Sequence, residues 1–348
     1  MTATTRAIRI ERLGEPEVLV EREVPLADPG PGEVHLRILA AGVNFADLMM
    51  RAGLYGTVPP RPYSPGFEVA GEVVRTGDGV RDWQAGDRAV ALVRFGGYAR
   101  DIIVHERHLF RYPASLSPVE AAAVPVTFLT AWIALHEAAR VRAGESVLVL
   151  NAGGGVGTAA VQLAVRAGCR VIGTAGSERK RTFVTNDLGA AHCFDSLGDW
   201  EPHVRGALGD AGLDVALDAV GGRATAACRR LLAPLGRLVF YGLSDAMPGR
   251  KRDWVRAAWA WLRTPRIHPL DLIVPNVGVF GIHLLHLRGK QTVLRPALQE
   301  IYRAVEAREL RPVLDRSFPL TRDGAVEAHR YLHERRNLGK VVLSASGS

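Results

Sequence analysis

The sequence has few cysteines, and none of them is spaced for a metal site. Among 348 residues there are three, Cys169, Cys193 and Cys228, and no two form a C-x-x-C pair. Such spacing excludes a disulfide framework and a structural zinc lobe. We therefore expect a protein of a reducing compartment.

Long apolar runs are also lacking. No segment has the length of a bilayer span, and residues 1–6 lack the apolar centre of a signal peptide. We expect a cytoplasmic protein that is not membrane-bound. The formal net charge is +8, but the arginines are spread along the chain without interleaved aromatics, which argues against nucleic acid as a partner. A basic surface would help to steer a polyanionic ligand.

The stretch from residue 146 to residue 181 has the pattern of a nucleotide-binding unit. Residues 147–150 are an apolar run of strand length, 151–157 are glycine-rich, 158–167 have helical spacing, and 170–174 form a second strand candidate. A strand, glycine turn, helix and strand in this order open a dinucleotide-binding unit.

The glycine turn reads Ala152-x-Gly154-x-x-Gly157, with alanine in place of the first glycine. Gly157 would let the helix pack close to the strand, and the unpaired helix N–H groups would face the phosphates. The alternative is a tight turn that binds nothing. The predicted cofactor contacts here are Gly153, Gly154, Gly155, Val156 and Gly157.

The end of the second strand indicates which dinucleotide binds. An NAD site usually carries an acidic residue there, whereas this chain continues from Thr174 to Ser177 and then to Arg179, Lys180 and Arg181. A 2′-phosphate requires charge-assisted donors. We predict NADPH, with Thr174, Ser177, Arg179 and Lys180 as contacts. The alternative is a solvated helix face that Glu178 partly neutralises.

The rest of the chain divides by pattern. Residues 7–104 hold short strand candidates between proline and glycine turns, which favours a small antiparallel barrel or sandwich. A helical linker is expected over 118–139. After residue 146 strands and helices alternate, which predicts a parallel doubly wound sheet. A tryptophan-rich segment over 247–276 could face a membrane, cover a pocket or meet a second subunit; a helix packed on the fold's own surface is favoured.

Several motifs occur in the order seen in one family. They are residues 41–47, 53–55, 65–71, 86–89 and 337–343. With the glycine turn, they resemble medium-chain dehydrogenase/reductases over essentially the whole chain. Within that superfamily the chain resembles the zinc-independent quinone oxidoreductase branch, especially vesicle amine transport protein homologues. Polyketide and fatty-acid enoyl reductase domains share the Asn44 and Tyr55 signatures.

The resemblance implies a doubly wound Rossmann sheet inserted into a β-rich GroES-like catalytic domain. The expected divisions are 1–124 for the first part of the catalytic domain, 125–270 for the NADP-binding domain, and 271–348 for the sheet edge and the return to the catalytic domain. The resemblance also implies a homodimer through the sheet edge near residues 279–282.

The metal prediction follows from two positions. Zinc-dependent relatives have a cysteine where Asn44 stands and a histidine where Phe67 stands, and neither residue here is a zinc ligand. We therefore predict no metal. Without a Lewis acid, hydride transfer needs an acceptor that is already electrophilic, such as a quinone or an α,β-unsaturated carbonyl.

Asn44 and Tyr55 are the predicted catalytic residues. Asn44 would make a polar contact to the nicotinamide ribose or the substrate, or would only fix the local turn. Tyr55 would donate a proton, or would only be a ring at the rim of the site. Matching positions imply further cofactor contacts at Thr130, Val220, Tyr241, Gly242, Phe280, Gly281, Ile282 and Asn337.

The leading hypothesis is an NADPH-dependent reductase of quinones or activated alkenes. The small-molecule acceptor would be a quinone, an enone or an enoyl thioester. One alternative is an enoyl-thioester or secondary-metabolite alkene reductase. Another is a protein that binds NADPH without catalysis, because members of superfamilies lose chemistry while keeping a fold.

Overall fold

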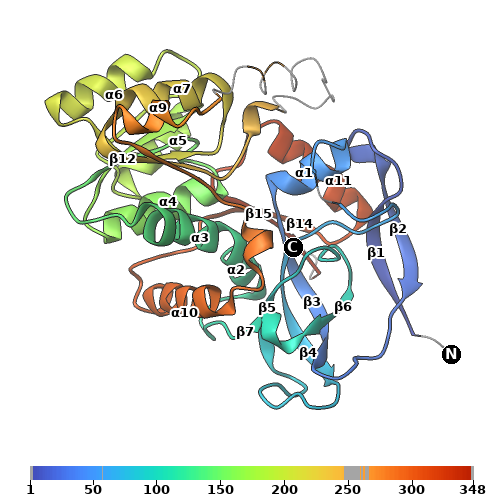
Figure 1. The fold of residues 1–348 in the computed structure, drawn as a ribbon. Coiled ribbons are helices and arrows are strands. Elements are labelled where there is room, and N and C mark those ends of the chain that lie inside the picture. The colour runs from blue at the N-terminus through green and yellow to red at the C-terminus, as the bar shows by residue number, and fades with distance from the viewer. Residues whose placement is uncertain (1–2, 57, 247–258, 260–261, 263–265, 346–348) are drawn as a thin grey trace. The chain divides into compact units, whose positions relative to one another are not determined.

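The computed structural model describes residues 3–56, 58–246, 259, 262 and 266–345. Most of the tryptophan-rich segment therefore lies outside the described residues. The described chain forms two compact units. Unit 1 comprises 3–126 and 285–345, and unit 2 comprises 127–246 and 266–284 (Figure 1). The domain limits that we expected, at 124/125 and 270/271, stay a prediction.

Unit 1 contains a seven-stranded sheet in the order β14-β15-β3-β4-β5-β7, with β6 also paired to β3. The strands are β3 (Glu33–Val43), β4 (Glu68–Thr76), β5 (Arg88–Leu92), β6 (Asp101–His105), β7 (Leu109–Phe110), β14 (Leu314–Pro319) and β15 (Lys340–Ser344). A separate ribbon pairs β1 (Thr4–Ile10) with β2 (Leu19–Pro25). Because β15 pairs antiparallel with β3, the end of the chain returns to the unit in which it began.

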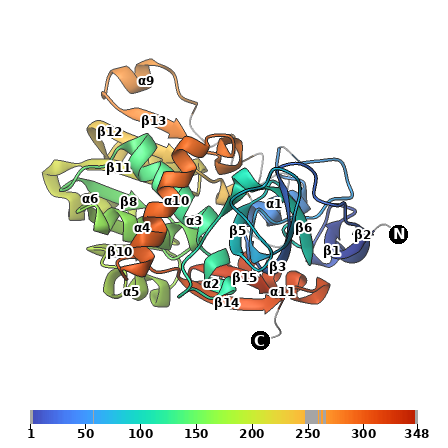
Figure 2. The ribbon, with the colours of Figure 1, turned by 90° about the horizontal axis from the view of Figure 1, so that it is seen from below.

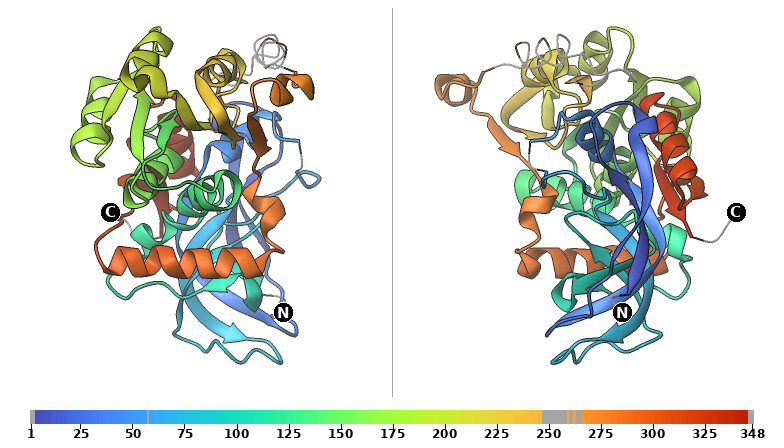
Figure 3. Two further views of the ribbon diagram at one scale, coloured as in Figure 1. Left: turned by 60° about the vertical axis from the view of Figure 1, so that its left-hand side comes forward. Right: turned by 90° about the vertical axis from the view of Figure 1, so that its right-hand side faces the viewer.

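Three longer helices accompany this sheet. Helix α1 (Phe45–Ala52) follows β3 directly, α10 (Gln291–Glu306) is the long helix drawn in orange in Figure 3, and α11 (Arg322–His333) precedes β15. The short elements are η1 (Pro16–Val18), η2 (Glu106–His108), α2 (Pro118–Ala122) and η6 (Leu284–Leu287).

Unit 2 is built on a six-stranded parallel sheet in the order β10-β9-β8-β11-β12-β13 (Figure 2). The strands are β8 (Ser146–Val149), β9 (Arg170–Ala175), β10 (His192–Asp195), β11 (Leu213–Asp218), β12 (Leu232–Phe240) and β13 (Gly278–Gly281). Counted along the chain this is the order 3-2-1-4-5-6, the Rossmann arrangement, whose switch point lies between β8 and β11. The predicted doubly wound sheet is confirmed.

Helices precede and connect the strands of unit 2. They are α3 (Pro125–Trp132), the π-helix η3 (Ile133–Ala139), α4 (Gly155–Arg166), α5 (Glu178–Asn186), α6 (Glu201–Leu208), η4 (Gly209–Ala211), α7 (Gly222–Leu231), η5 (Ser244–Ala246) and α9 (Leu270–Ile273). The core between sheet and helices includes Leu148, Ile172, Leu238 and Cys228, all without solvent exposure. Cys228 therefore packs as a small apolar side chain.

Two sequence expectations need correction. The single helical linker expected over 118–139 is broken after α2, because Pro125 begins a new helix and its ring cannot continue the previous one. Helix α4 begins at Gly155 rather than Thr158, so part of the glycine turn is already helical.

Candidate functional site

The glycine turn lies at the carboxyl end of β8, where α4 begins. The N–H of Gly154 donates to the carbonyl of Asn151 at 2.9 Å, and the N–H of Ala152 donates to that of Thr174 at 2.9 Å. Gly154 is the N-cap of α4. The predicted turn residues and Thr174 are therefore brought together at a helix N-terminus beside the switch point, where phosphate is favoured.

Two glycines of this turn are packed too closely for a side chain. A Cβ on Gly157 would lie 2.2 Å from the carbonyl oxygen of Asn151, so the close packing expected of this residue is present. A Cβ on Gly153 would lie 2.9 Å from Cβ of Lys180. The aliphatic part of Lys180 therefore lies against the turn.

The end of β9 leads into α5 through Ser177. Its hydroxyl caps the helix by accepting from the N–H of Lys180 at 3.4 Å. Arg179 and Lys180 thus stand in the first turn of α5. The third cation, Arg181, lies 3.5 Å from a carboxylate oxygen of Asp195, so it is partly neutralised.

A buried carboxylate that sequence reasoning missed organises the turn after β11. Asp218 has no solvent exposure and accepts from the N–H groups of Val220 at 2.7 Å and Gly221 at 2.9 Å. It also accepts from the hydroxyl of Thr225 at 2.6 Å. The sequence does contain a signal for this carboxylate, because an aspartate ends an apolar strand shortly before a Gly-Gly pair.

Tyr241, after β12, has a buried hydroxyl that no other described residue hydrogen-bonds. Burial raises the pKa of this phenol. Buried polar groups normally have partners, so this hydroxyl fits a polar group of a ligand. Its neighbour Gly242 is closely packed, because a Cβ would lie 3.0 Å from the carbonyl oxygen of Ala219.

The remaining predicted contacts in unit 2 lie on α3 and β13. Thr130 is buried on α3. Phe280, on the edge strand β13, is 44% exposed. A Cβ on Gly281 would meet nothing within 4 Å, and Ile282 donates to the carbonyl of Phe240 at 2.7 Å.

In unit 1, Asn44 belongs to a buried polar cluster with Glu68 and Lys340. The Lys340 ammonium donates to Asn44 Oδ1 at 2.6 Å and to Glu68 Oε1 at 2.5 Å. Asn44 Nδ2 donates to Glu68 Oε1 at 3.0 Å. Sequence reasoning did not find Glu68 and Lys340, although a lysine that begins an apolar tail strand was a signal.

Asp47 on α1 is fully buried beside this cluster. Its carboxylate accepts from the N–H groups of Asn44 at 2.8 Å and Gly66 at 2.9 Å, which gives it a structural role. Tyr98 donates a weaker bond at 3.4 Å. Burial raises the pKa of Asp47 to about 7.

The network continues from Tyr98 to the tail helix α11. The Tyr98 hydroxyl lies 3.3 Å from Nε2 of His329, and Arg51 donates to Nδ1 of the same ring at 3.2 Å. Arg51 also contacts His333 and the carbonyl of Gly14. Burial and the nearby guanidinium lower the pKa of His329 well below its usual value, so its ring is neutral.

Tyr55 is half-buried, and its ring centroid lies 6.2 Å from that of Phe67. Burial raises the pKa of Tyr55 to about 12, so the phenol keeps its proton at neutral pH. Asn337 donates to the carbonyl of Gly339 at 2.8 Å, within its own turn.

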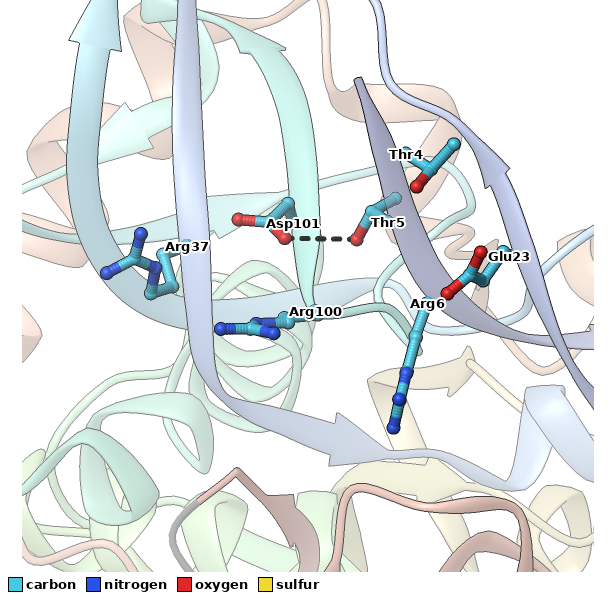
Figure 4. Close-up of a pocket in the computed structure, with 7 residues that line it drawn as sticks. All are labelled: Thr4, Thr5, Arg6, Glu23, Arg37, Arg100 and Asp101. Carbon is cyan, nitrogen blue, oxygen red and sulfur yellow. Dashed lines mark hydrogen bonds between the residues drawn. The ribbon is translucent and has the colours of Figure 1, made fainter. Parts of the chain in front are cut away.

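A pocket of about 280 Å³ in unit 1 lies away from these residues (Figure 4). Its lining consists of Thr4, Thr5, Arg6, Glu23, Arg37, Arg100 and Asp101. Asp101 accepts from Thr5 at 3.0 Å and contacts His35. No predicted catalytic or cofactor residue lines this pocket, so we do not assign it to the reaction.

Two features of the described residues bear on other functions. In that part of the chain no three His, Cys, Asp or Glu side chains gather as a metal site would require, and the absence of a metal stays a prediction. The helices within the described ranges include none with the length and apolarity of a membrane span.

The chain matches two protein families and many known proteins. Residues 30–114 match the alcohol dehydrogenase GroES-like domain, and residues 188–343 match the zinc-binding dehydrogenase family. The synaptic vesicle membrane protein VAT-1 homolog of Rattus norvegicus is 36% identical over 322 residues, which cover 90% of this chain and 77% of that protein.

Solved structures are similar to this chain as well. The quinone oxidoreductase of Thermus thermophilus, solved alone and with NADPH, is 37% identical with a TM-score of 0.80, over 97% of this chain and 99% of that one. The CurK enoyl reductase is 27% identical with a TM-score of 0.83, over 98% and 99%. The chain therefore belongs to the medium-chain dehydrogenase/reductase family of oxidoreductases, in its quinone oxidoreductase-like branch.

Proposed function

We propose that this protein is an NADPH-dependent reductase that transfers hydride, without a metal, to a quinone or an α,β-unsaturated carbonyl. The observation that carries the proposal is the glycine turn at the switch point, with the Lys180 side chain lying against Gly153. The similarity to a quinone oxidoreductase that was solved with NADPH supports it.

The residues of unit 2 fit this cofactor. The turn at Gly157 has no room for side chains, the α4 N-terminus favours phosphate, and the buried Tyr241 hydroxyl needs a partner. Ser177, Arg179 and Lys180 at the start of α5 would hold the 2′-phosphate. Bound NADPH would supply the hydride.

The residues of unit 1 do not fit a zinc ion. Asn44 Oδ1 already accepts from an ammonium 2.6 Å away, and a cation at this amide would be repelled by Lys340. Phe67, at the other position compared above, is buried and has no ligand atom. We therefore propose a reaction without zinc, and stoichiometric zinc by elemental analysis would contradict it.

Tyr55 is the proton donor that we propose. Reduction of a conjugated carbonyl leaves an enolate, which needs a proton. A phenol with a pKa of about 12 is neutral at pH 7 and can donate that proton. Burial also reduces competition from water around such a donor.

The experiment is NADPH oxidation measured with a panel of quinones, enones and enoyl thioesters. Turnover with quinones or enones supports the proposal. A preference for enoyl thioesters or secondary-metabolite alkenes would favour the second candidate, which the similarity to the CurK enoyl reductase supports. Tight NADPH binding without turnover on any acceptor would favour a non-catalytic binding protein. We also propose a cytoplasmic homodimer with no nucleic-acid partner.

A further inference from the structure

The sheet register of unit 1 brings three distant residues to one point. Strand β15 pairs with β3 so that Val341 lies opposite Val43, which places Lys340 beside Asn44. Strand β4 pairs with β3 so that Val69 lies opposite Ala41, which places Glu68 beside Gly42. Gly42 has to be glycine here, because a Cβ would lie 2.4 Å from Glu68 Oε1.

These contacts determine the orientation of the Asn44 amide. An ammonium lies on the oxygen side at 2.6 Å, and a carboxylate lies on the nitrogen side at 3.0 Å. A flipped amide would face its NH₂ toward Lys340 and its oxygen toward Glu68, which is repulsive on both sides. Lys340 is 4% exposed and Glu68 is fully buried, so water does not screen this arrangement.

The same contacts limit what Asn44 can do. Its NH₂ group donates to Glu68 and, more weakly at 3.5 Å, to the carbonyl of Gly42. The amide oxygen also faces the N–H of Asp47 in the capping box of α1, but no side-chain hydrogen bond caps the helix there. The capacity left to Asn44 is therefore the second acceptor position of Oδ1, since an amide oxygen accepts two hydrogen bonds. Asn44 can therefore receive a hydrogen bond from a hydroxyl, but it has no donor left for a substrate oxyanion.

We propose that Lys340, together with Glu68, is a positioning residue that holds Asn44 as an acceptor for a hydroxyl of the nicotinamide ribose. This inference rests on the proposed function and chooses between the two contacts predicted for Asn44. Glu68 has a further partner within unit 1, because its Oε2 accepts from the N–H of Val126 at 2.7 Å.

The test compares dissociation constants of two ligands. Lys340→Met should weaken NADPH binding about five- to tenfold, the effect of one lost hydrogen bond. It should leave adenosine 2′,5′-bisphosphate, which has no nicotinamide ribose, within about twofold. Lys290→Met, at an exposed position of the same unit, is the matched control and should change neither constant.

A double-mutant cycle separates positioning from a general structural role. If Lys340 acts through Asn44, Lys340→Met in an Asn44→Ala background should change the NADPH dissociation constant less than about twofold. An unchanged NADPH dissociation constant in Lys340→Met would overturn the inference. So would an equal loss of NADPH affinity in the wild-type and Asn44→Ala backgrounds. If the wild type bound no NADPH at all, the proposed function would fail first.

If Lys340→Met did not fold, a second variant would still test the inference. Removing one member of a buried ion pair leaves the other uncompensated. The double variant Glu68→Gln with Lys340→Met removes both charges, and Lys340→Arg keeps the cation. We expect the double variant to show the same selective loss of NADPH affinity. Wild-type affinity in a folded double variant would overturn the inference.

Discussion

Arg51 on α1 donates to Nδ1 of His329 on α11 at 3.2 Å, across 278 positions of sequence, and neither side chain is exposed to solvent. The bond joins the first helix of unit 1 to the tail helix that precedes β15. Because Arg51 is a buried cation, its partners decide how stable this part of the unit is.

Replacing His329 by phenylalanine should destabilise the protein by about 2–3 kcal/mol, because a buried charged donor loses its acceptor. Urea unfolding measures the change. The control is Arg330→Ala on the same helix, whose exposed ion pair with Glu17 should be worth less than about 1 kcal/mol. Equal losses of unfolding free energy in the two variants would show that the buried Arg51–His329 bond stabilises the protein no more than the exposed ion pair does.

The stability contributed by His329 should depend on pH. Burial and Arg51 lower its pKa in the folded protein, so below pH ~6.5 the unfolded chain binds a proton that folded His329 does not. The free energy of unfolding of wild type should therefore fall, relative to His329→Phe, as pH decreases from 7 to 5. The slope should reach at most about 1.4 kcal/mol per pH unit.

Neighbouring groups affect this comparison in known directions. Asp47, with its pKa raised to about 7, favours the folded state at low pH and loses that contribution as pH rises through 7. Both proteins contain Asp47, so its contribution largely cancels in the difference. A difference that stays constant between pH 7 and pH 5 would mean that His329 has the same pKa in the folded and unfolded states, which contradicts the lowered pKa.

Alanine at two positions of the glycine turn should have different effects. Gly157→Ala would place a methyl group 2.2 Å from a backbone oxygen, and we expect a loss of about 1–3 kcal/mol or more. Gly154→Ala meets only the Asn151 carbonyl at 3.3 Å, so the fold should tolerate it. It should still weaken NADPH binding, which fluorescence titration measures. If Gly154→Ala bound NADPH with wild-type affinity, the pyrophosphate would have to bind elsewhere.

Lys180 should determine selectivity for the phosphorylated cofactor. Lys180→Ala removes a cation whose aliphatic stem lies against the turn, and a charge-assisted bond of about 1.5–3 kcal/mol predicts a loss of NADPH affinity of roughly tenfold or more. NADH affinity should change little. Arg205→Ala, on the exposed face of α6, is the control. A parallel loss for NADH and NADPH would refute a 2′-phosphate contact at this lysine.

The predicted homodimer can be tested at β13. The N–H of Ile282 donates to the carbonyl of Phe240 on β12. Because successive N–H groups of a strand point to opposite sides, the N–H of Gly281 points away from β12. Gly281→Pro should remove this donor and reduce dimerisation, whereas Gly281→Ala has open space and should not. Light scattering measures both. A Gly281→Pro protein of wild-type mass would exclude pairing through this donor.

Local patterns in the sequence predicted much of unit 2. The apolar runs that became β8 and β9, the glycine turn between them and the helix after it depend on residues close in sequence. Their order also predicted the doubly wound sheet, because connections between parallel strands are short and of one hand. Strands rich in charged residues, such as β2 (Leu19–Pro25), carried too weak an alternation to be found.

The sequence by itself therefore determined the dinucleotide-binding unit and the family motifs around Asn44 and Tyr55. Only the tertiary structure decided which side chains surround Asn44. Lys340 and Glu68 are 272 positions apart, and they meet because β15 and β4 pair with β3 in one particular register. A shift of one residue would turn either side chain to the other face of the sheet, and no local pattern encodes that choice.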